Sequence, residues 1–211
     1  FIKNSIYTYF GKILYKVSLS SSSHVFFQNT SDQKLFQDMN LVSAKKNSVI
    51  PGSGVDTVHF KINKKKNLGN RFLFVGRLIG DKGIEEYLQA ASKVVKIYPK
   101  KEFLIAGELG SSNRTAFSKE KLDYYIKSFT QIKFLGKVEN IKSILSEVDV
   151  MVLPSYREGL SRSILEASSM NLPVITTDTP GCRDVIFDRY NGYLCKERSV
   201  VSLFNAIVKM I

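Results

Sequence analysis

The chain has 211 residues, 44% of them hydrophobic, which is enough for one sizeable core or about one and a half domains. It contains no apolar run of about 18 residues, so the sequence predicts no membrane-spanning helix. Two cysteines without metal-type spacing, Cys182 and Cys195, and only two histidines favour buried, reduced thiols over a metal site or a disulfide. Because residue 1 is Phe and no signal-peptide pattern follows, we expect a fragment of a longer protein.

The net charge of +12 is unevenly distributed along the chain. Residues 1–71 hold eleven Lys/Arg and three Asp/Glu, whereas the remaining residues hold twenty and sixteen. A basic excess of this kind attracts nucleic acid, anionic lipid or phosphorylated ligands without distinguishing among them. The charge alone therefore leaves these three partner classes open.

The first predicted element is an amphipathic helix that ends at a run of serines, residues 20–23. Its apolar residues recur at spacings of four, four, three and four: Ile2, Ile6, Phe10, Ile13 and Val17. Such a stripe predicts a helix that faces a core. The alternative is a basic, aromatic helix lying on a membrane surface, because Lys12 and Lys16 share another face of the helix.

Three short elements follow the first helix. Residues 24–29 (HVFFQN) predict a strand, and residues 47–56 (NSVIPGSGVD) predict a strand that enters a glycine-rich turn. Between them, residues 30–39 predict a helix in which Thr30 and Gln33 have the spacing of a capping box.

The basic, polar segment 61–70 (KINKKKNLGN) predicts a surface linker and a domain boundary. From residue 71 onward, short apolar strands alternate with amphipathic helices. The predicted strands are 71–76, 102–107, 132–136, 148–154 and 172–177, and the predicted helices are 84–98, 115–129, 140–147, 161–170 and 199–211. This alternation predicts the α/β class, with βαβ units that form a Rossmann-like, doubly wound and mostly parallel sheet.

Two cations follow the first strand of this region. Gly76 ends the strand, Arg77 comes next, and Lys82 lies in a glycine-containing loop just before a helix. A helix N-terminus with two cations favours a phosphate group, because free N–H groups and positive charge converge there. The segment matches neither the P-loop nor the dinucleotide fingerprint, and an isolated Arg and Lys in such a turn are more often surface charges.

A second polar constellation lies in residues 154–167 (PSYREGLSRSILEA). Glu158 stands just before a predicted helix and Glu166 lies eight residues later, on the same face. Gly159 permits close approach of the backbone, and Ser161 is placed to cap the helix. Carboxylates and outward N–H groups of Gly159, Leu160 and Ser161 suit vicinal hydroxyls and phosphate, whereas either glutamate alone would be a solvated side chain. Together the two constellations fit a sugar–diphosphate–ribose ligand.

The motifs VGRLIGDKG, E-x7-E, PVITTDTPGCRDVI and NGYL together resemble the retaining glycosyltransferases of the GT-B fold in the family of glycosyl transferases group 1 (GT4). The subgroup they resemble builds bacterial polysaccharides and lipid-linked oligosaccharides. The resemblance implies that residues 71–211 are the C-terminal, nucleotide-sugar-binding domain, truncated at its end. Residues 1–60 would then be the end of the N-terminal domain and the interdomain connection. In this family the N-terminal domain binds the acceptor, and most of it would be absent from this chain.

The resemblance also assigns roles to residues. Arg77 and Lys82 would bind the donor diphosphate, Glu166 the ribose, and Glu158 the donor sugar together with the N–H groups of residues 159–161. The loop formed by Gly136, Lys137 and Val138 would face the base. The family needs no metal, its retention of configuration is ascribed to front-face attack, and UDP is favoured over GDP as the nucleotide.

The resemblance further implies transfer of a hexose or N-acetylhexosamine to a saccharide acceptor, one attached to a polyprenyl diphosphate. The expected location is the cytoplasm, with peripheral attachment to the inner face of the cytoplasmic membrane. One alternative is a basic nucleic-acid-binding module, although the sequence lacks the signatures of the common modules. A sugar-nucleotide epimerase or a phosphorylase is a third reading, which the E-x7-E element and the absence of a pyridoxal-lysine context oppose.

Overall fold

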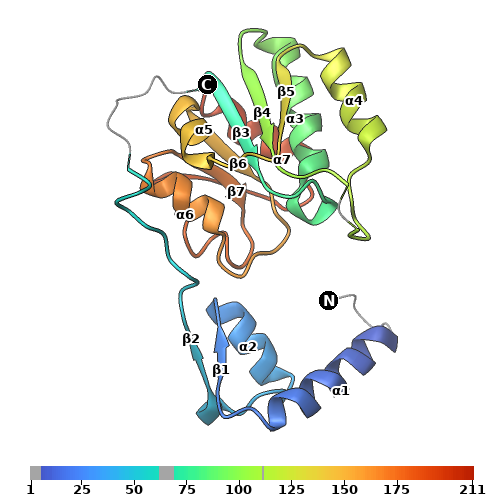
Figure 1. Ribbon diagram of the computed structural model, residues 1–211, viewed down its shortest axis with the longest axis vertical. Coiled ribbons are helices and arrows are strands. Elements are labelled where there is room, and N and C mark those ends of the chain that lie inside the picture. The colour runs from blue at the N-terminus through green and yellow to red at the C-terminus, as the bar shows by residue number, and fades with distance from the viewer. Residues whose placement is uncertain (1–5, 62–68, 111) are drawn as a thin grey trace. The chain divides into compact units, whose positions relative to one another are not determined.

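The computed structural model describes residues 6–61, 69–110 and 112–211 and divides the chain into two compact units, Phe1–Ser53 and Gly54–Ile211 (Figure 1). Most of the predicted linker, residues 62–68, lies outside the described residues. Within the described residues, no helix is both long and apolar enough to cross a bilayer.

The first unit is a small α/β arrangement. It contains α1 (Ile6–Ser20), β1 (Val25–Phe27), α2 (Thr30–Asp38), the 3-10 turn η1 (Ala44–Lys46) and β2 (Asn47–Val49). β1 and β2 pair in parallel. The predicted capping box of α2 is wrong by one residue, because Asn29 is the N-cap and its side chain accepts a hydrogen bond from the Asp32 N–H at 2.7 Å.

The expectation that the first helix faces a core is wrong for the described residues. No side chain of α1 is buried, and Ile6, Phe10 and Val17 are 67%, 56% and 67% exposed. The described part of this unit provides only Phe27 and Leu41 as buried apolar side chains, which is too little surface to cover the stripe. Ile2 lies outside the described residues.

The second unit contains a six-stranded parallel sheet with the order β5-β4-β3-β6-β7-β8. The strands are β3 (Arg71–Val75), β4 (Glu102–Ala106), β5 (Ile132–Gly136), β6 (Val150–Leu153), β7 (Val174–Thr177) and β8 (Gly192–Cys195). The helices are η2 (Gly80–Lys82), α3 (Ile84–Ile97), α4 (Lys119–Ser128), α5 (Ile141–Glu147), α6 (Arg162–Ser169) and α7 (Val200–Val208). This confirms the predicted doubly wound, parallel sheet.

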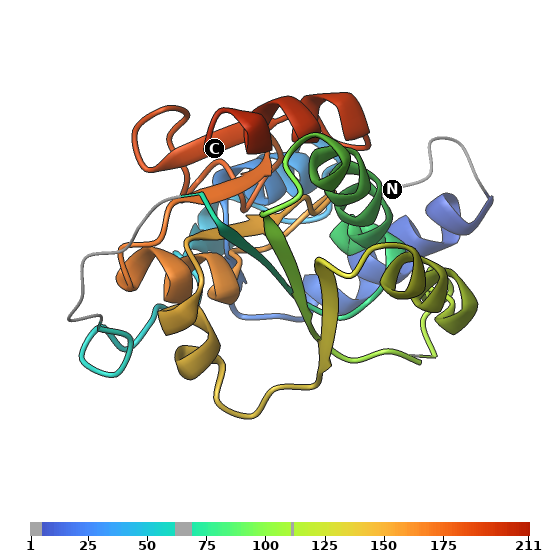
Figure 2. The same cartoon turned by 90° about the horizontal axis from the view of Figure 1, so that it is seen from above.

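Helices cover both faces of this sheet, with α3, α4 and α7 on one face and α5 and α6 on the other (Figure 2). The buried core consists of apolar strand residues and the apolar side chains of the helices that pack against them. Phe72 of β3 and Phe103 of β4 stack at 5.0 Å, and the buried Tyr87 of α3 donates its hydroxyl to the Phe72 and Leu104 carbonyls. The two-sided packing explains why β3, β4, β6 and β7 are buried along almost their whole length, whereas burial alternates along the edge strand β5.

Two elements differ from the sequence prediction. The strand β8 was not predicted, because four residues at the sheet edge carry little pattern of their own. The helix expected over residues 115–129 begins only at Lys119, since Thr115 and Phe117 bond back to the loop after β3, through the Thr115 carbonyl to Gly80 N–H and the Phe117 N–H to the Leu78 carbonyl.

The two cysteines are buried and unpaired, which confirms the prediction of reduced thiols. Burial raises the pKa of the Cys195 thiol to about 12 and also raises that of Cys182. Both thiols are therefore protonated and unreactive in the folded chain.

Candidate functional site

The strand order creates one point at which successive loops diverge. The chain moves from β3 outward to β4 and β5, crosses back to β6, and then moves outward in the other direction to β7 and β8. In doubly wound sheets, ligands bind at the carboxyl edge at such a switch point. Here the two loops are residues 76–83 after β3 and residues 154–161 after β6, the two polar constellations that the sequence singled out.

The loop after β3 is locked against the loop after β6 by a close backbone contact. Gly83 is the N-cap of α3 in a left-handed conformation, with φ of 71°. A side chain at this position would collide with the carbonyl oxygen of Pro154, so only glycine permits this approach. The Asp81 carbonyl then accepts hydrogen bonds from Ser155 Oγ at 3.1 Å and from the Tyr156 N–H at 2.9 Å.

Two of the predicted site residues meet directly across these loops. Lys82 Nζ lies 2.5 Å from Glu158 Oε1, and the two side chains are only 22% and 11% exposed. An ion pair of such limited exposure is screened less than a surface pair, and either charge alone would be costly to bury. The structure thus places a cation and an acceptor-only carboxylate side by side at the switch point.

The loop after β7 supports the backbone of Glu158. The Glu158 N–H donates to the Pro180 carbonyl at 3.2 Å, and Gly181 lies so close to the Glu158 and Gly159 carbonyls that a side chain could not fit. Asp184 accepts a hydrogen bond from the Gly181 N–H at 2.8 Å. Residues 180–184 (PGCRD) therefore support the backbone of Glu158.

Glu166 has a different partner from Glu158. It is 9% exposed on α6, and its carboxylate lies 3.3 Å from Arg162 Nη2, one turn earlier on the same helix. Burial raises the pKa of Glu166, and the positive charge of Arg162 opposes this shift. Sequence reasoning missed Arg162, although its i,i+4 spacing from Glu166 was the available signal.

The remaining predicted residues lie at the same carboxyl edge. Arg77 is exposed directly after β3; its carbonyl accepts from the Ile79 N–H, and its side chain has no ion pair or hydrogen bond among the described residues. The Gly76 N–H donates to the Ala106 carbonyl and the Gly107 N–H to the Gly136 carbonyl, which aligns the ends of β3, β4 and β5. Gly136, Lys137 and Val138 therefore lie at this edge, two strands away from β3.

The predicted cap by the Ser161 hydroxyl is wrong. Ser161 occupies the N-cap position of α6, but its side chain makes no capping hydrogen bond there and instead contacts Ser163 Oγ at 3.2 Å. The N-terminus of α6 consequently carries no side-chain cap, and the N–H groups expected to bind phosphate there remain a prediction.

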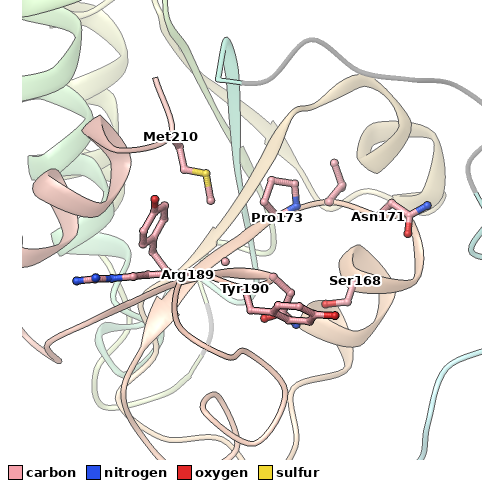
Figure 3. Close-up of a pocket in the computed structure, with 10 residues that line it drawn as sticks. Ser168, Asn171, Pro173, Arg189, Tyr190 and Met210 are labelled. Carbon is pink, nitrogen blue, oxygen red and sulfur yellow. The ribbon is translucent and has the colours of Figure 1, made fainter.

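A cavity of about 510 Å³ lies elsewhere, at the amino ends of β7 and β8 (Figure 3). Its lining includes Ser168, Asn171, Pro173, Arg189 and Tyr190, and none of the predicted site residues. Because ligands of doubly wound sheets bind at the opposite, carboxyl edge, we assign the candidate site to the switch point rather than to this cavity. Among the described residues, no group of three or more His, Cys, Asp or Glu is placed to hold a metal ion.

The fold and the switch-point site define a doubly wound α/β protein that presents a cation, carboxylates and an uncapped helix N-terminus at one sheet edge. The particular family follows from comparison with known proteins: the chain belongs to the family Glycosyl transferases group 1, whose model matches residues 69–211. This match leaves the nucleic-acid-binding alternative without support.

Two curated relatives illustrate the similarity. The chain is 34% identical over 182 residues to the UDP-Gal:alpha-D-GlcNAc-diphosphoundecaprenol alpha-1,3-galactosyltransferase of Escherichia coli, covering 80% of this chain and 46% of that protein. It is 26% identical over 207 residues to the N,N'-diacetylbacillosaminyl-diphospho-undecaprenol alpha-1,3-N-acetylgalactosaminyltransferase of Campylobacter jejuni, covering 92% and 52%. The chain thus spans about half the length of the curated relatives it matches.

Among solved structures, Anabaena Alr3699/HepE in complex with UDP is similar to this chain with a TM-score of 0.81. The sequence identity is 19%, and the similarity covers 96% of this chain and 58% of that one. At this identity the likeness shows the fold, which agrees with the predicted C-terminal half of a GT-B glycosyltransferase.

Proposed function

We propose that this chain is the donor-binding half of a retaining glycosyltransferase that transfers a hexose or N-acetylhexosamine from a nucleotide sugar to a saccharide acceptor. The observation that carries the proposal is the Lys82–Glu158 pair at the switch point of a chain that belongs to Glycosyl transferases group 1. A diphosphate next to a sugar needs a cation and a hydroxyl acceptor within a few ångströms of each other. This pair supplies both.

Arg77 and Lys82 bind the donor diphosphate in this proposal. Both follow β3, and Lys82 lies immediately before the N-terminus of α3, where N–H groups and the helix dipole favour an anion. Their positive charge stabilises the nucleotide diphosphate as it leaves, which is the electrostatic contribution that usually dominates catalysis. Two such cations neutralise the leaving group without a metal ion.

In this proposal, the carboxylates of Glu158 and Glu166 bind the donor sugar and the ribose. Glu158, together with the N–H groups of Gly159, Leu160 and Ser161, holds the donor sugar and its phosphate. Glu166, whose carboxyl group is buried on α6, accepts hydrogen bonds from the ribose hydroxyls. The loop 136–138 faces the base.

UDP is the nucleotide we propose for the donor. The Escherichia coli relative is named for its UDP-Gal donor, and the Anabaena structure contains UDP. The names of both curated relatives include an undecaprenol diphosphate-linked acceptor, so we propose a lipid-linked saccharide acceptor and a role in surface polysaccharide or glycan biosynthesis.

We also propose that the enzyme works in the cytoplasm and attaches peripherally to the inner face of the cytoplasmic membrane. The basic excess of residues 1–71 and the exposed apolar side chains of α1 support this attachment. Flotation of the full-length enzyme with liposomes tests it. Recovery that is greater with anionic than with neutral vesicles supports an electrostatic contribution, and equal recovery removes it.

Calorimetric titration with UDP, GDP and ADP tests the proposed donor site. We expect selective binding of UDP that is weakened about tenfold or more by Arg77→Ala and by Glu166→Ala, because each removes a charge-assisted contact. Arg189→Ala and Glu120→Ala are matched controls, since both side chains are exposed and lie outside the site. Absence of UDP binding by both this chain and the full-length protein would overturn the proposal.

A further inference from the structure

We infer that Tyr156 is a positioning residue for Glu158 and that it acts through Glu86. This inference rests on the proposed function, because it concerns the geometry of the carboxylate that holds the donor sugar. Tyr156 belongs to the loop after β6, two residues before Glu158, and Glu86 belongs to the first turn of α3, four residues after Lys82.

A hydrogen bond from Tyr156 runs alongside the ion pair of Glu158. The Tyr156 hydroxyl donates to Glu86 Oε1 at 2.6 Å, and Glu158 accepts from Lys82 at 2.5 Å. Both interactions join the same two segments, residues 82–86 and residues 156–158. Two parallel links restrict rotation of one segment against the other in a way that a single ion pair does not.

Glu86 depends on this hydrogen bond. Its second oxygen, Oε2, is buried and has no hydrogen-bond partner within the part of the chain that the structure describes. A buried carboxylate with few donors is costly, so the Tyr156 hydroxyl is strongly held in place. Burial, followed by the hydrogen bond to Glu86, raises the pKa of Tyr156, so the hydroxyl stays protonated and able to donate.

A third loop fixes the aromatic ring itself. The guanidinium carbon of Arg198 lies 4.4 Å from the centroid of the Tyr156 ring, within the range of a cation–π contact. Arg198 lies between β8 and α7 and has a left-handed backbone, with φ of 53°, which is uncommon for a residue other than glycine. The tyrosine is thus held at its hydroxyl and over its ring by different elements.

The rest of the loop does not depend on the hydroxyl. The Tyr156 N–H bonds to the Asp81 carbonyl, and the Glu158 N–H bonds to the Pro180 carbonyl. Tyr156→Phe therefore retains the path of the backbone and loses only the link from the side chain to α3. Because small displacements of a binding group have large effects on a bound substrate, we expect the sugar contact of Glu158 to weaken selectively.

The experiment compares the wild-type chain with Tyr156→Phe by calorimetry, using UDP and the UDP-hexose that the wild type binds most tightly. Tyr190→Phe is the matched control, because it removes the same atom from a tyrosine that is 89% exposed at the opposite sheet edge (Figure 3). We expect Tyr156→Phe to weaken the UDP-hexose about tenfold and UDP less than about twofold. Tyr190→Phe is expected to change neither affinity.

A second pair of variants separates positioning from a general loss of stability. Glu86→Gln keeps an acceptor oxygen for the tyrosine and should retain UDP-hexose binding, whereas Glu86→Leu should reproduce Tyr156→Phe. Equal weakening of UDP and UDP-hexose in Tyr156→Phe, or no weakening of either, overturns the inference. If the wild type binds neither ligand, it is the proposed function that fails.

Discussion

Glu158 illustrates how one side chain can serve two partners. In the chain without ligand it neutralises Lys82 at 2.5 Å, at the place where the proposal puts a diphosphate. A diphosphate and Glu158 therefore compete for the same ammonium group. In the proposed site, the carboxylate would also repel the bound diphosphate, which would weaken UDP, while it would accept hydrogen bonds from the sugar hydroxyls.

The Glu158→Gln substitution tests this competition. We expect UDP to bind about threefold more tightly, because a neutral amide releases Lys82 and removes the repulsion. The additional affinity of a UDP-hexose over UDP should fall about tenfold, because the amide is a weaker hydroxyl acceptor. Titrations of both ligands with wild type and variant measure the two effects, and weaker UDP binding by the variant would contradict the competition.

Burial of Glu166 in the folded chain disfavours the ionised form of its carboxyl group. Its pKa is raised by burial, so the folded state binds a proton more readily than the unfolded state, whose carboxyl has the ordinary value of 4.5. The protonated form is therefore favoured by folding. Stability attributable to this group is present below pH 4.5 and is lost as the pH rises through the raised pKa.

Glu166→Gln should consequently raise the melting temperature at pH 7 while it weakens UDP binding. The gain in melting temperature should shrink as the pH is lowered toward 4.5, since the wild-type carboxyl then becomes neutral as well. Calorimetric melting of wild type and variant from pH 4.5 to pH 8 measures the difference. A gain that stays constant with pH would show that burial of the charge is not its cause.

At the scale of elements, glycines decide how closely the loops of the sheet approach each other. Gly83 and Gly136 both have left-handed backbones, with φ of 71° and 69°. They differ in their surroundings: a side chain at Gly83 would collide with Pro154, whereas a side chain at Gly136 would meet no atom within 4 Å. Substitutions at these two glycines therefore distinguish the effect of backbone strain from the effect of a steric clash.

We expect Gly136→Ala to lower the free energy of unfolding by about 1 kcal/mol, the cost of a left-handed non-glycine residue. Gly83→Ala should lower it by about 3 kcal/mol, because overpacking against the loop after β6 adds to the same strain. Urea unfolding of the two variants measures both values. An equal decrease in the free energy of unfolding for both variants would mean that the backbone near Pro154 moves to accommodate a side chain at position 83 without an energetic cost.

At the scale of the whole molecule, the two units have very different cores. The cluster of buried apolar side chains lies entirely within residues 54–211, and β3 to β8 provide its centre. The described part of the first unit buries only two apolar side chains, Phe27 and Leu41. The second unit therefore contains both the stabilising core and the candidate site.

A chain truncated to residues 54–211 should fold and bind UDP as tightly as the 211-residue chain. Its urea midpoint should match that of the main transition of the longer chain, because the core is unchanged by the truncation. Unfolding curves and calorimetry of the two chains provide the comparison. A lower midpoint or weaker UDP binding would show that residues 1–53 contribute to the second unit.

The sequence by itself determined the α/β class and most of the strands of the second unit. Runs such as RFLFV and EFLIA are short, apolar and separated by helical periodicity, and these are local properties of the chain. The sequence also located the cations after β3 and the E-x7-E element, because each constellation lies within one short segment. Helix starts were less accurate: Asn29 and Ser118 cap their helices through local bonds to the Asp32 and Lys121 N–H groups, whereas Ser161 makes no capping bond.

Only the tertiary structure decided which of these segments meet. Lys82 and Glu158 are 76 residues apart, and Tyr156 and Glu86 are 70 apart, so each pairing requires β3 and β6 to be neighbours. That adjacency follows from the crossover after β5, which no local pattern encodes. The edge strand β8 is likewise defined by its pairing with β7. The physical reason is the same throughout: local sequence sets backbone conformation, whereas contacts between distant segments arise when one shared core is buried.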